Sequence, residues 1–157
     1  MCVHISQNER FHAAESVITK TLCWQGERNH KLPDARIRNH RIHYRVTADY
    51  ATIRPEDGCD ESVTEAIAAL VNSSIVKSHN LIVDLSHVEY VETPGFRWLI
   101  RQFRHLQSEG RCLVVCGLPK SVQRSFKALR LDSVIPCASD AMEARQMLNV
   151  DIKAIAV

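Results

Sequence analysis

The segment LIVDLSHVEYVETPGFRWLIRQF (residues 81–103) joins a buried strand to an amphipathic helix. Its first part, LIVDLS, is an almost uninterrupted apolar run, which is typical of a strand covered on both faces. From Pro94 onward the apolar residues recur at helical spacing, while Arg97 and Arg101 lie on another face. Thr93 as the N-cap and Pro94 as the first helical residue predict where this helix begins.

Strands and helices also alternate on both sides of this segment. Upstream, the pattern predicts two antiparallel strands and a helix, over residues 41–46, 51–53 and 62–76. Downstream, it predicts a strand, a helix, a short strand and a last helix, over residues 112–117, 120–130, 134–137 and 139–148. The fold class predicted is α/β, a mixed sheet with a mainly parallel centre, an antiparallel edge pair and about four helices.

Single residues mark the ends of these elements. Residues 55–60 are predicted to form a loop, and Asp60 is predicted to cap the helix that follows it. Gly110 is predicted to end the arginine-bearing helix, and Ser139 to cap the last one. In helix 120–130, three residues are expected to face the core: Val122, Phe126 and Leu129.

Composition bounds the class of protein. The chain has 157 residues, 45% of them hydrophobic and 24% charged, which excludes a wholly disordered or collagen-like chain. We expect an N-terminal extension over 1–40 that is partly ordered, a domain over 41–150 and a tail over 151–157. No run is long enough for a membrane helix and the first ten residues lack a secretory core, so we expect a cytoplasmic protein.

The sequence contains no recognisable catalytic or ligand-binding motif. Its six cysteines form no CxxC pair, and no glycine-rich phosphate loop is present. The histidines in the front of the chain lack ligand spacing; they are His4, His12, His30, His40 and His43. The net charge of +2 is too small to indicate a nucleic-acid partner. We therefore expect no enzymatic activity, no metal, no cofactor and no nucleic acid.

The stretch DLSHVEYVETPGFRWL resembles the core of the STAS family, the bacterial anti-sigma factor antagonists and their relatives. In that family a strand ending in Asp-Leu-Ser leads to an Asp-Ser-(Ser/Thr)-Gly motif at a helix start. Here Asp84 belongs to the first part, and the residues from Glu92 to Gly95 stand at the motif. The resemblance covers residues 41–150 and implies a STAS-like fold.

It also implies a function. In the family, a serine/threonine kinase that acts as an anti-sigma factor phosphorylates the first hydroxyl after the acidic residue, and a phosphatase reverses this. The unphosphorylated domain docks on the kinase. Carried over, Thr93 is the phosphorylation site and Glu92 its acidic neighbour. The other residues implied in docking, or in shaping the docking surface, are Gly95, Arg97, Arg101, Asp84 and Asp60.

A second hypothesis stays open at this point. Glu92 and Pro94 stand where the family has an aspartate and a small residue, and Thr93 replaces the commoner serine. A STAS domain without a phosphorylation switch would act as a constitutive docking or scaffold subunit, of the stress-signalling or lipid-transport type. Phosphate on Thr93 distinguishes the two hypotheses.

Overall fold

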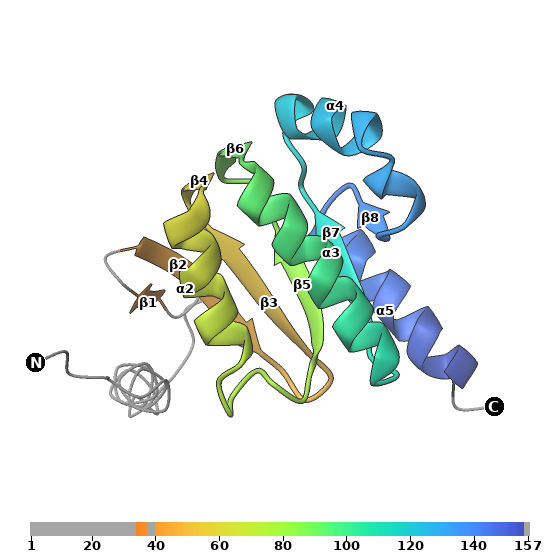
Figure 1. The fold of residues 1–157 in the computed structure, drawn as a ribbon. Coiled ribbons are helices and arrows are strands. Elements are labelled where there is room, and N and C mark those ends of the chain that lie inside the picture. Colours follow the sequence, from red (N-terminus) through yellow and green to blue (C-terminus); the bar gives the residue numbers. More distant parts are fainter. Residues whose placement is uncertain (1–33, 38–39, 156–157) are drawn as a thin grey trace, which may run out of the picture.

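The computed structural model describes residues 34–37 and 40–155 and forms a layered α/β domain in this part (Figure 1). The strands are β1 (Asp34–Ile37), β2 (His40–Val46), β3 (Tyr50–Pro55), β4 (Asp57–Cys59), β5 (Asn80–Asp84), β6 (Val88–Val91), β7 (Leu113–Cys116) and β8 (Cys137–Ala138). The helices are α2 (Glu61–Val71), α3 (Thr93–Ser108), α4 (Lys120–Ala128), the 3-10 turn η1 (Leu131–Ser133) and α5 (Ala141–Ile155).

The larger sheet has the strand order β1-β2-β3-β5-β7-β8. Strands β1, β2 and β3 pair antiparallel, whereas β3, β5, β7 and β8 run parallel. The prediction of a mixed sheet with a mainly parallel centre and four helices is therefore confirmed for the described residues. Central strands β5 and β7 are buried on both faces, which explains their continuous apolar sequences.

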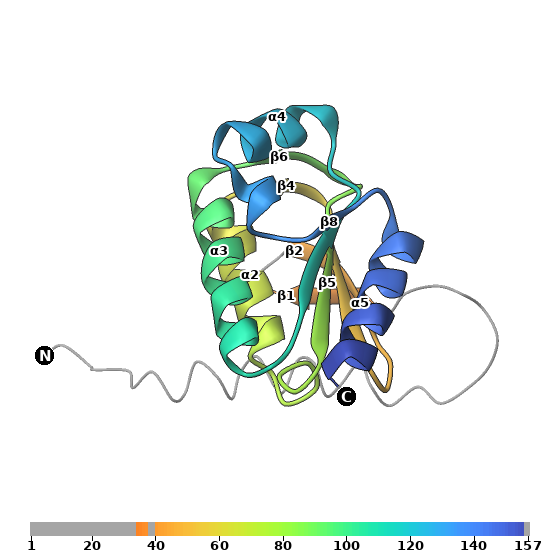
Figure 2. The same cartoon turned by 90° about the vertical axis from the view of Figure 1, so that its right-hand side faces the viewer.

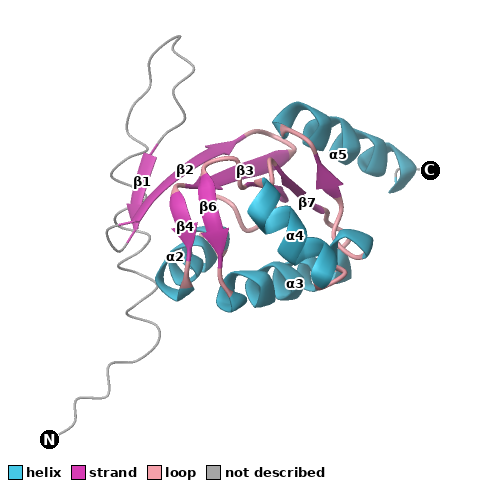
Figure 3. Ribbon diagram, turned by 90° about the horizontal axis from the view of Figure 1, so that it is seen from above, coloured by secondary structure: helices cyan, strands magenta, loops and turns pink. Residues whose placement is uncertain are grey.

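Helices cover the sheet on both sides. Helices α2 and α3 lie on one side, and α5 lies on the other (Figures 2 and 3). The main core lies under α2 and α3 and includes Ile53, Leu70, Val83 and Leu99. A smaller core lies under α5. It is formed by Ile82, Val114, Cys116, Ala138, Ala144 and Leu148.

Five segments differ from the sequence-based expectation. Strand β6 was not predicted. The predicted strand 134–137 is wrong, because the N–H groups of Val134 and Ile135 donate back to Leu131 O and the strand, β8, begins only at Cys137. The predicted loop over 55–60 contains strand β4, which pairs parallel with β6 in a second, two-stranded sheet. The predicted helix 62–76 ends at Val71, and turns follow it. Strand β1 falls within the predicted extension 1–40 and places Ile37 in the core. Residues 1–33 lie outside the described part, and the limits of extension and tail stay predictions.

Two predicted helix ends can be compared with the structure, the C-terminus of α3 and the N-terminus of α5. Gly110 follows α3 with a φ of +69°, and Arg111 N–H donates to Leu106 O at 2.8 Å, so the predicted glycine stop is confirmed. Ser139 is not the cap of α5. Asp140 is the cap instead, because its Oδ1 accepts the backbone N–H groups of Met142 and Glu143 at 2.8 and 2.9 Å.

Candidate functional site

Two helices begin side by side at one edge of the domain, where the small sheet ends. Strand β4 leads into α2 and strand β6 leads into α3, and the two strands pair parallel with Cys59 opposite Val91. The backbone N–H of Glu92 donates to the carbonyl oxygen of Cys59 at 3.0 Å. The predicted site residues Asp60 and Glu92 are therefore the N-caps of two neighbouring helices.

Gly95 allows the start of α3 to lie close to β4. A Cβ at this position would come within 2.8 Å of Val91 Cγ1 and within 3.2 Å of Cys59 O and Sγ. Real Cβ atoms have essentially no contacts as short as 2.8 Å, so only glycine fits without a shift. Gly95 is buried and shapes the site from below rather than lying on its surface.

The two caps differ in chemistry. Asp60 Oδ1 accepts the backbone N–H of Val63 at 2.9 Å, as predicted for a cap. Glu92, and not Thr93, is the N-cap of α3, and its side chain makes no capping hydrogen bond. Thr93 is the first helical residue and Pro94 the second, so the helix begins one residue earlier than expected. The first turn of α3 therefore has no side-chain cap.

The remaining predicted residues divide into exposed and buried ones. Glu92, Thr93, Arg97 and Arg101 are exposed. Within residues 34–37 and 40–155, no ion pair or hydrogen bond involves the side chains of Arg97 and Arg101. Asp84, by contrast, is buried at 9% exposure.

Asp84 contacts the start of the connection to β6. Its Oδ1 accepts the backbone N–H of Ser86 at 3.0 Å. The same oxygen would lie 2.8 Å from a Cβ on Gly117, whose φ is +67°, so the end of β7 also packs closely on it. Asp84 thus helps to position the loop that leads to the small sheet.

A hollow of about 540 Å³ lies between the start of α3 and the end of α4. It is lined by Val91, Glu92, Thr93, Pro94, Phe96, Ser125, Ala128 and Leu129. The rings of Phe96 and Phe126 meet edge to face at 5.8 Å and hold α4 beside α3. Thr93 therefore shares a hollow with residues of α4.

The prediction for Leu129 is wrong, and the error concerns this hollow. Leu129 was expected in the core, but it is 55% exposed. It is the C-cap of α4, where the chain leaves the helix, so helical spacing no longer places its side chain on the inner face. An exposed leucine beside Thr93 gives the hollow an apolar rim.

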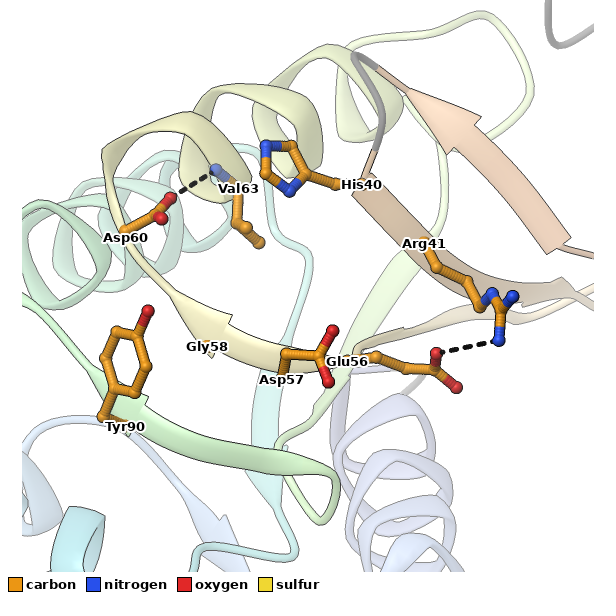
Figure 4. A pocket seen from close by; sticks show the side chains of 8 residues that line it. All are labelled: His40, Arg41, Glu56, Asp57, Gly58, Asp60, Val63 and Tyr90. Carbon is orange, nitrogen blue, oxygen red and sulfur yellow. Dashed lines mark hydrogen bonds and ion pairs between the residues drawn. The ribbon is translucent and has the colours of Figure 1, made fainter.

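A second pocket of about 520 Å³ lies near the start of α2. It is lined by His40, Arg41, Glu56, Asp57, Gly58, Asp60, Val63 and Tyr90 (Figure 4). The ring of Tyr90 lies against Gly58, where a Cβ would collide with it. Tyr90 is 47% exposed and adds an aromatic surface beside the capped end of α2.

The cysteines in the described part are buried or partly buried thiols. Burial, together with the charges of Asp84 and Asp140, raises the pKa of Cys116 to about 12. Burial also raises the pKa of Cys59 and Cys137. Such thiols are poor nucleophiles at neutral pH. Within the described residues, no cluster of three or more His, Cys, Asp or Glu side chains could hold a metal ion.

Comparison with known proteins agrees with this geometry. The family model of the STAS domain matches residues 37–144, which is more than half of the chain. The chain therefore belongs to the STAS domain family. Among the described residues, no helix has the length and apolar character needed to cross a bilayer.

Several solved structures share the fold, and two of the three described below are of anti-sigma factor antagonists. An antagonist from Mycobacterium paratuberculosis is 17% identical, with a TM-score of 0.62 over 69% of this chain and 92% of that one. Unphosphorylated SpoIIAA is 17% identical, with a TM-score of 0.54 over 69% and 96%. A variant of RsbS from Moorella thermoacetica is 22% identical, with a TM-score of 0.58 over 71% and 97%. At these identities the likeness concerns the fold.

Proposed function

We propose that this protein is a phosphorylation-controlled binding module of the anti-sigma factor antagonist type. Its partner is a serine/threonine kinase that acts as an anti-sigma factor, and the protein itself has no enzymatic activity. The observation that carries the proposal is the exposed hydroxyl of Thr93, at the first helical position of α3 and on the wall of a hollow with an apolar rim. The fold shared with anti-sigma factor antagonists supports the class of partner.

The docking surface centres on the start of α3. Glu92, Thr93 and Pro94 form one wall of the hollow, and Leu129 forms part of the other. An exposed leucine beside a small polar residue is suited to contact an apolar side chain of a partner. Arg97 and Arg101 continue the surface along the exposed side of α3, where they favour a partner with acidic groups nearby.

Phosphate on Thr93 would change this surface without unfolding α3. It adds about −1.5 to −2 charges at neutral pH. The uncapped N-terminus of α3 stabilises a negative charge there, and Arg97 lies one turn further on the same helix. The hollow would then hold a hydrated dianion where docking requires an apolar contact, so the modified form is expected to dissociate. A phosphatase would restore docking.

The test begins with the modification itself. Intact-mass spectrometry and peptide mapping of the protein from its native host should find phosphate on Thr93 in one growth condition. Wild type, Thr93→Ala and Thr93→Glu are then compared for docking on the kinase-type anti-sigma factors of that host. Thr93→Ala should dock like wild type, and Thr93→Glu should lose at least about tenfold in affinity, about 1.4 kcal/mol.

Ser108→Glu is the matched control, because it places the same charge at the exposed C-terminal end of the same helix. It should dock like wild type. If Thr93 is unmodified in growing and in stressed cells, and Thr93→Glu docks normally, the protein is a constitutive docking subunit. That result would contradict the phosphorylation switch but would leave the start of α3 as the proposed docking surface.

A further inference from the structure

Strands β2 and β3 carry a basic face on the side opposite α2. Their residues alternate strictly between core and surface. Ile42, Tyr44, Ala51 and Ile53 belong to the main core. The intervening side chains form the outer face of β2 and β3. These are Arg41, His43 and Arg45 on β2 and Tyr50, Thr52 and Arg54 on β3, where Tyr50 packs partly buried against the smaller core under α5. Helix α5 lies on this side of the sheet but packs on β5, β7 and β8 (Figure 3).

The pairing register brings four of these side chains together. His43 lies directly opposite Arg54, and Arg45 directly opposite Thr52. Neighbouring pairs on one face of a sheet lie within reach of long side chains, so Arg45 and Arg54 can contact the same group. Arg45, Thr52 and Arg54 therefore occupy neighbouring positions on the outer face.

Glu56, the carboxylate that directly follows β3, already has two other partners. Glu56 Oε1 lies 2.5 Å from His43 Nε2, and Glu56 Oε2 lies 3.5 Å from Arg41 Nη1. Within residues 34–37 and 40–155, no ion pair or side-chain hydrogen bond satisfies the guanidinium groups of Arg45 and Arg54. The Nε of Arg54 is buried and lacks a hydrogen-bond partner. The guanidinium groups of Arg45 and Arg54 are therefore available to an anionic group.

We propose that the outer face of β2 and β3 binds an acidic segment of a partner protein through Arg45 and Arg54. Guanidinium groups pair with carboxylates in a bidentate manner, which gives such a contact geometric specificity as well as charge attraction. This face is separate from the start of α3, so it provides a second docking surface. It does not depend on the proposed switch.

The composition of the face favours a protein over the other anionic partners. A nucleic acid is bound by longer tracks of cations, and single strands also need exposed aromatic rings. Glu56 limits the cationic track at one end. A membrane surface requires apolar side chains that enter the lipid, and the aromatic ring of this face, Tyr50, is instead partly buried against the smaller core under α5. Two free guanidinium groups match two carboxylates of a short acidic segment.

The test uses the full chain and a fluorescently labelled, glutamate-rich peptide. Fluorescence anisotropy should show binding that weakens on raising the salt, as expected for screened charges. Arg54→Gln and Arg45→Gln should each weaken binding at least about fivefold, and the double variant should abolish it. Arg54→Lys keeps the charge but not the fork geometry and should be intermediate. Arg124→Gln, on the exposed side of α4, is the control and should bind like wild type.

A second measurement locates the contact. The side-chain Nε–H signal of Arg54 in a nitrogen–proton NMR spectrum should shift as peptide is added, while the Arg124 signal stays in place. Single-stranded RNA, duplex DNA and phosphatidylserine vesicles are tested in parallel. Preferential binding of any of these would overturn the proposal, as would equal peptide binding by the double variant or no peptide binding at all. Thr93→Glu should bind the peptide normally, which separates this result from the switch.

Discussion

The backbone N–H of Glu92 is hydrogen-bonded to the carbonyl oxygen of Cys59 at 3.0 Å, which ties the start of α3 to the end of β4. Asp60, the next residue, caps α2. The two helix starts therefore behave as one unit, and a change at either is expected to affect the other. The backbone at the proposed docking surface around Thr93 is therefore fixed by this hydrogen bond to β4.

Gly95→Ala should disturb this unit, because the new Cβ would lie 2.8 Å from Val91 Cγ1 and 3.2 Å from Cys59 O. We expect a loss of about 1–3 kcal/mol in the free energy of unfolding, measured in urea, and weaker docking. Gly110→Ala is the control. It meets no atom within 4 Å but has a φ of +69°, so it should cost about 1 kcal/mol and leave docking intact. Wild-type stability of Gly95→Ala would contradict the close packing.

Removing the two caps should have unequal effects. Asp60→Ala loses the hydrogen bond to Val63 N–H and should destabilise the protein by about 1 kcal/mol. Glu92→Ala removes a side chain that makes no capping hydrogen bond and should change stability by less than about 0.5 kcal/mol. Urea unfolding of both variants checks this. Equal losses of unfolding free energy in the two variants would contradict the finding that the Glu92 side chain does not cap α3.

Arg130 is a site where a substitution should stabilise the protein. Its φ is +54°, in the left-handed region between α4 and η1, which costs a side-chain-bearing residue about 1–2 kcal/mol. Glycine relieves this cost but also increases the conformational entropy of the unfolded chain, which offsets part of the gain. Arg130→Gly should therefore raise the free energy of unfolding by about 0.5–1 kcal/mol. Lys127→Gly, within α4, is the comparison and should lower it by about 1 kcal/mol. A thermal or urea midpoint below wild type for Arg130→Gly would refute the expectation.

Cys116 should resist alkylation in the folded protein. Burial and the nearby Asp84 and Asp140 raise its pKa to about 12, so at pH 8 almost none of it is thiolate. Iodoacetamide at pH 8, followed by peptide mapping, should leave Cys116 unmodified until urea unfolds the chain. Cys137, which is only partly buried, serves as the internal reference and should react sooner. Rapid labelling of native Cys116 would show that β7 opens.

Glu56 should make stability depend on pH in the acid range. The hydrogen bond from His43, aided by the charges of His43, Arg41 and His87, holds its pKa below the ordinary value of 4.5 despite an opposing effect of burial. The fold thus favours the carboxylate, and this stabilisation is present above pH 4.5 and is lost as the pH falls through the lower folded-state pKa. Urea midpoints measured across this range should fall less steeply for Glu56→Gln.

Glu89→Gln is the matched control, because Glu89 is exposed and its side chain makes no hydrogen bond or ion pair among the described residues. Its pH dependence should follow wild type. Identical acid profiles for Glu56→Gln and wild type would mean that the pair of His43 and Glu56 contributes nothing to the fold.

Much of the fold could be predicted because its signals are local. Continuous apolar runs marked β5 and β7, and helical spacing with a glycine stop marked α3. The short strand β4 could not be predicted, because its three residues include Asp57 and Gly58, which are rare in strands. Its pairing partner, β6, is distant in sequence, and only the assembled domain brings the two together.

The candidate site residues came from the resemblance to the STAS family rather than from local periodicity. Of these residues, Glu92, Thr93 and Arg97 are exposed, whereas Asp84 and Gly95 are buried. The role of Gly95 was missed, because its close contact is with Cys59 on another element. Leu129 was misplaced, since helical spacing does not apply beyond the last turn of α4. The helical spacing of apolar residues could not show that Leu129 is exposed in the folded domain.

The sequence by itself indicated the antiparallel strands β2 and β3, the central strands β5 and β7 and the four helices, and it placed Thr93 at the start of α3. It could do so because periodicity and helix-start residues act over a few neighbours. Only the tertiary structure decided what surrounds that threonine. It set Leu129 across the hollow, joined Glu92 to Cys59, and left Arg45 and Arg54 on an open sheet face. These relations depend on contacts between distant segments, whose geometry is set by packing of the whole domain.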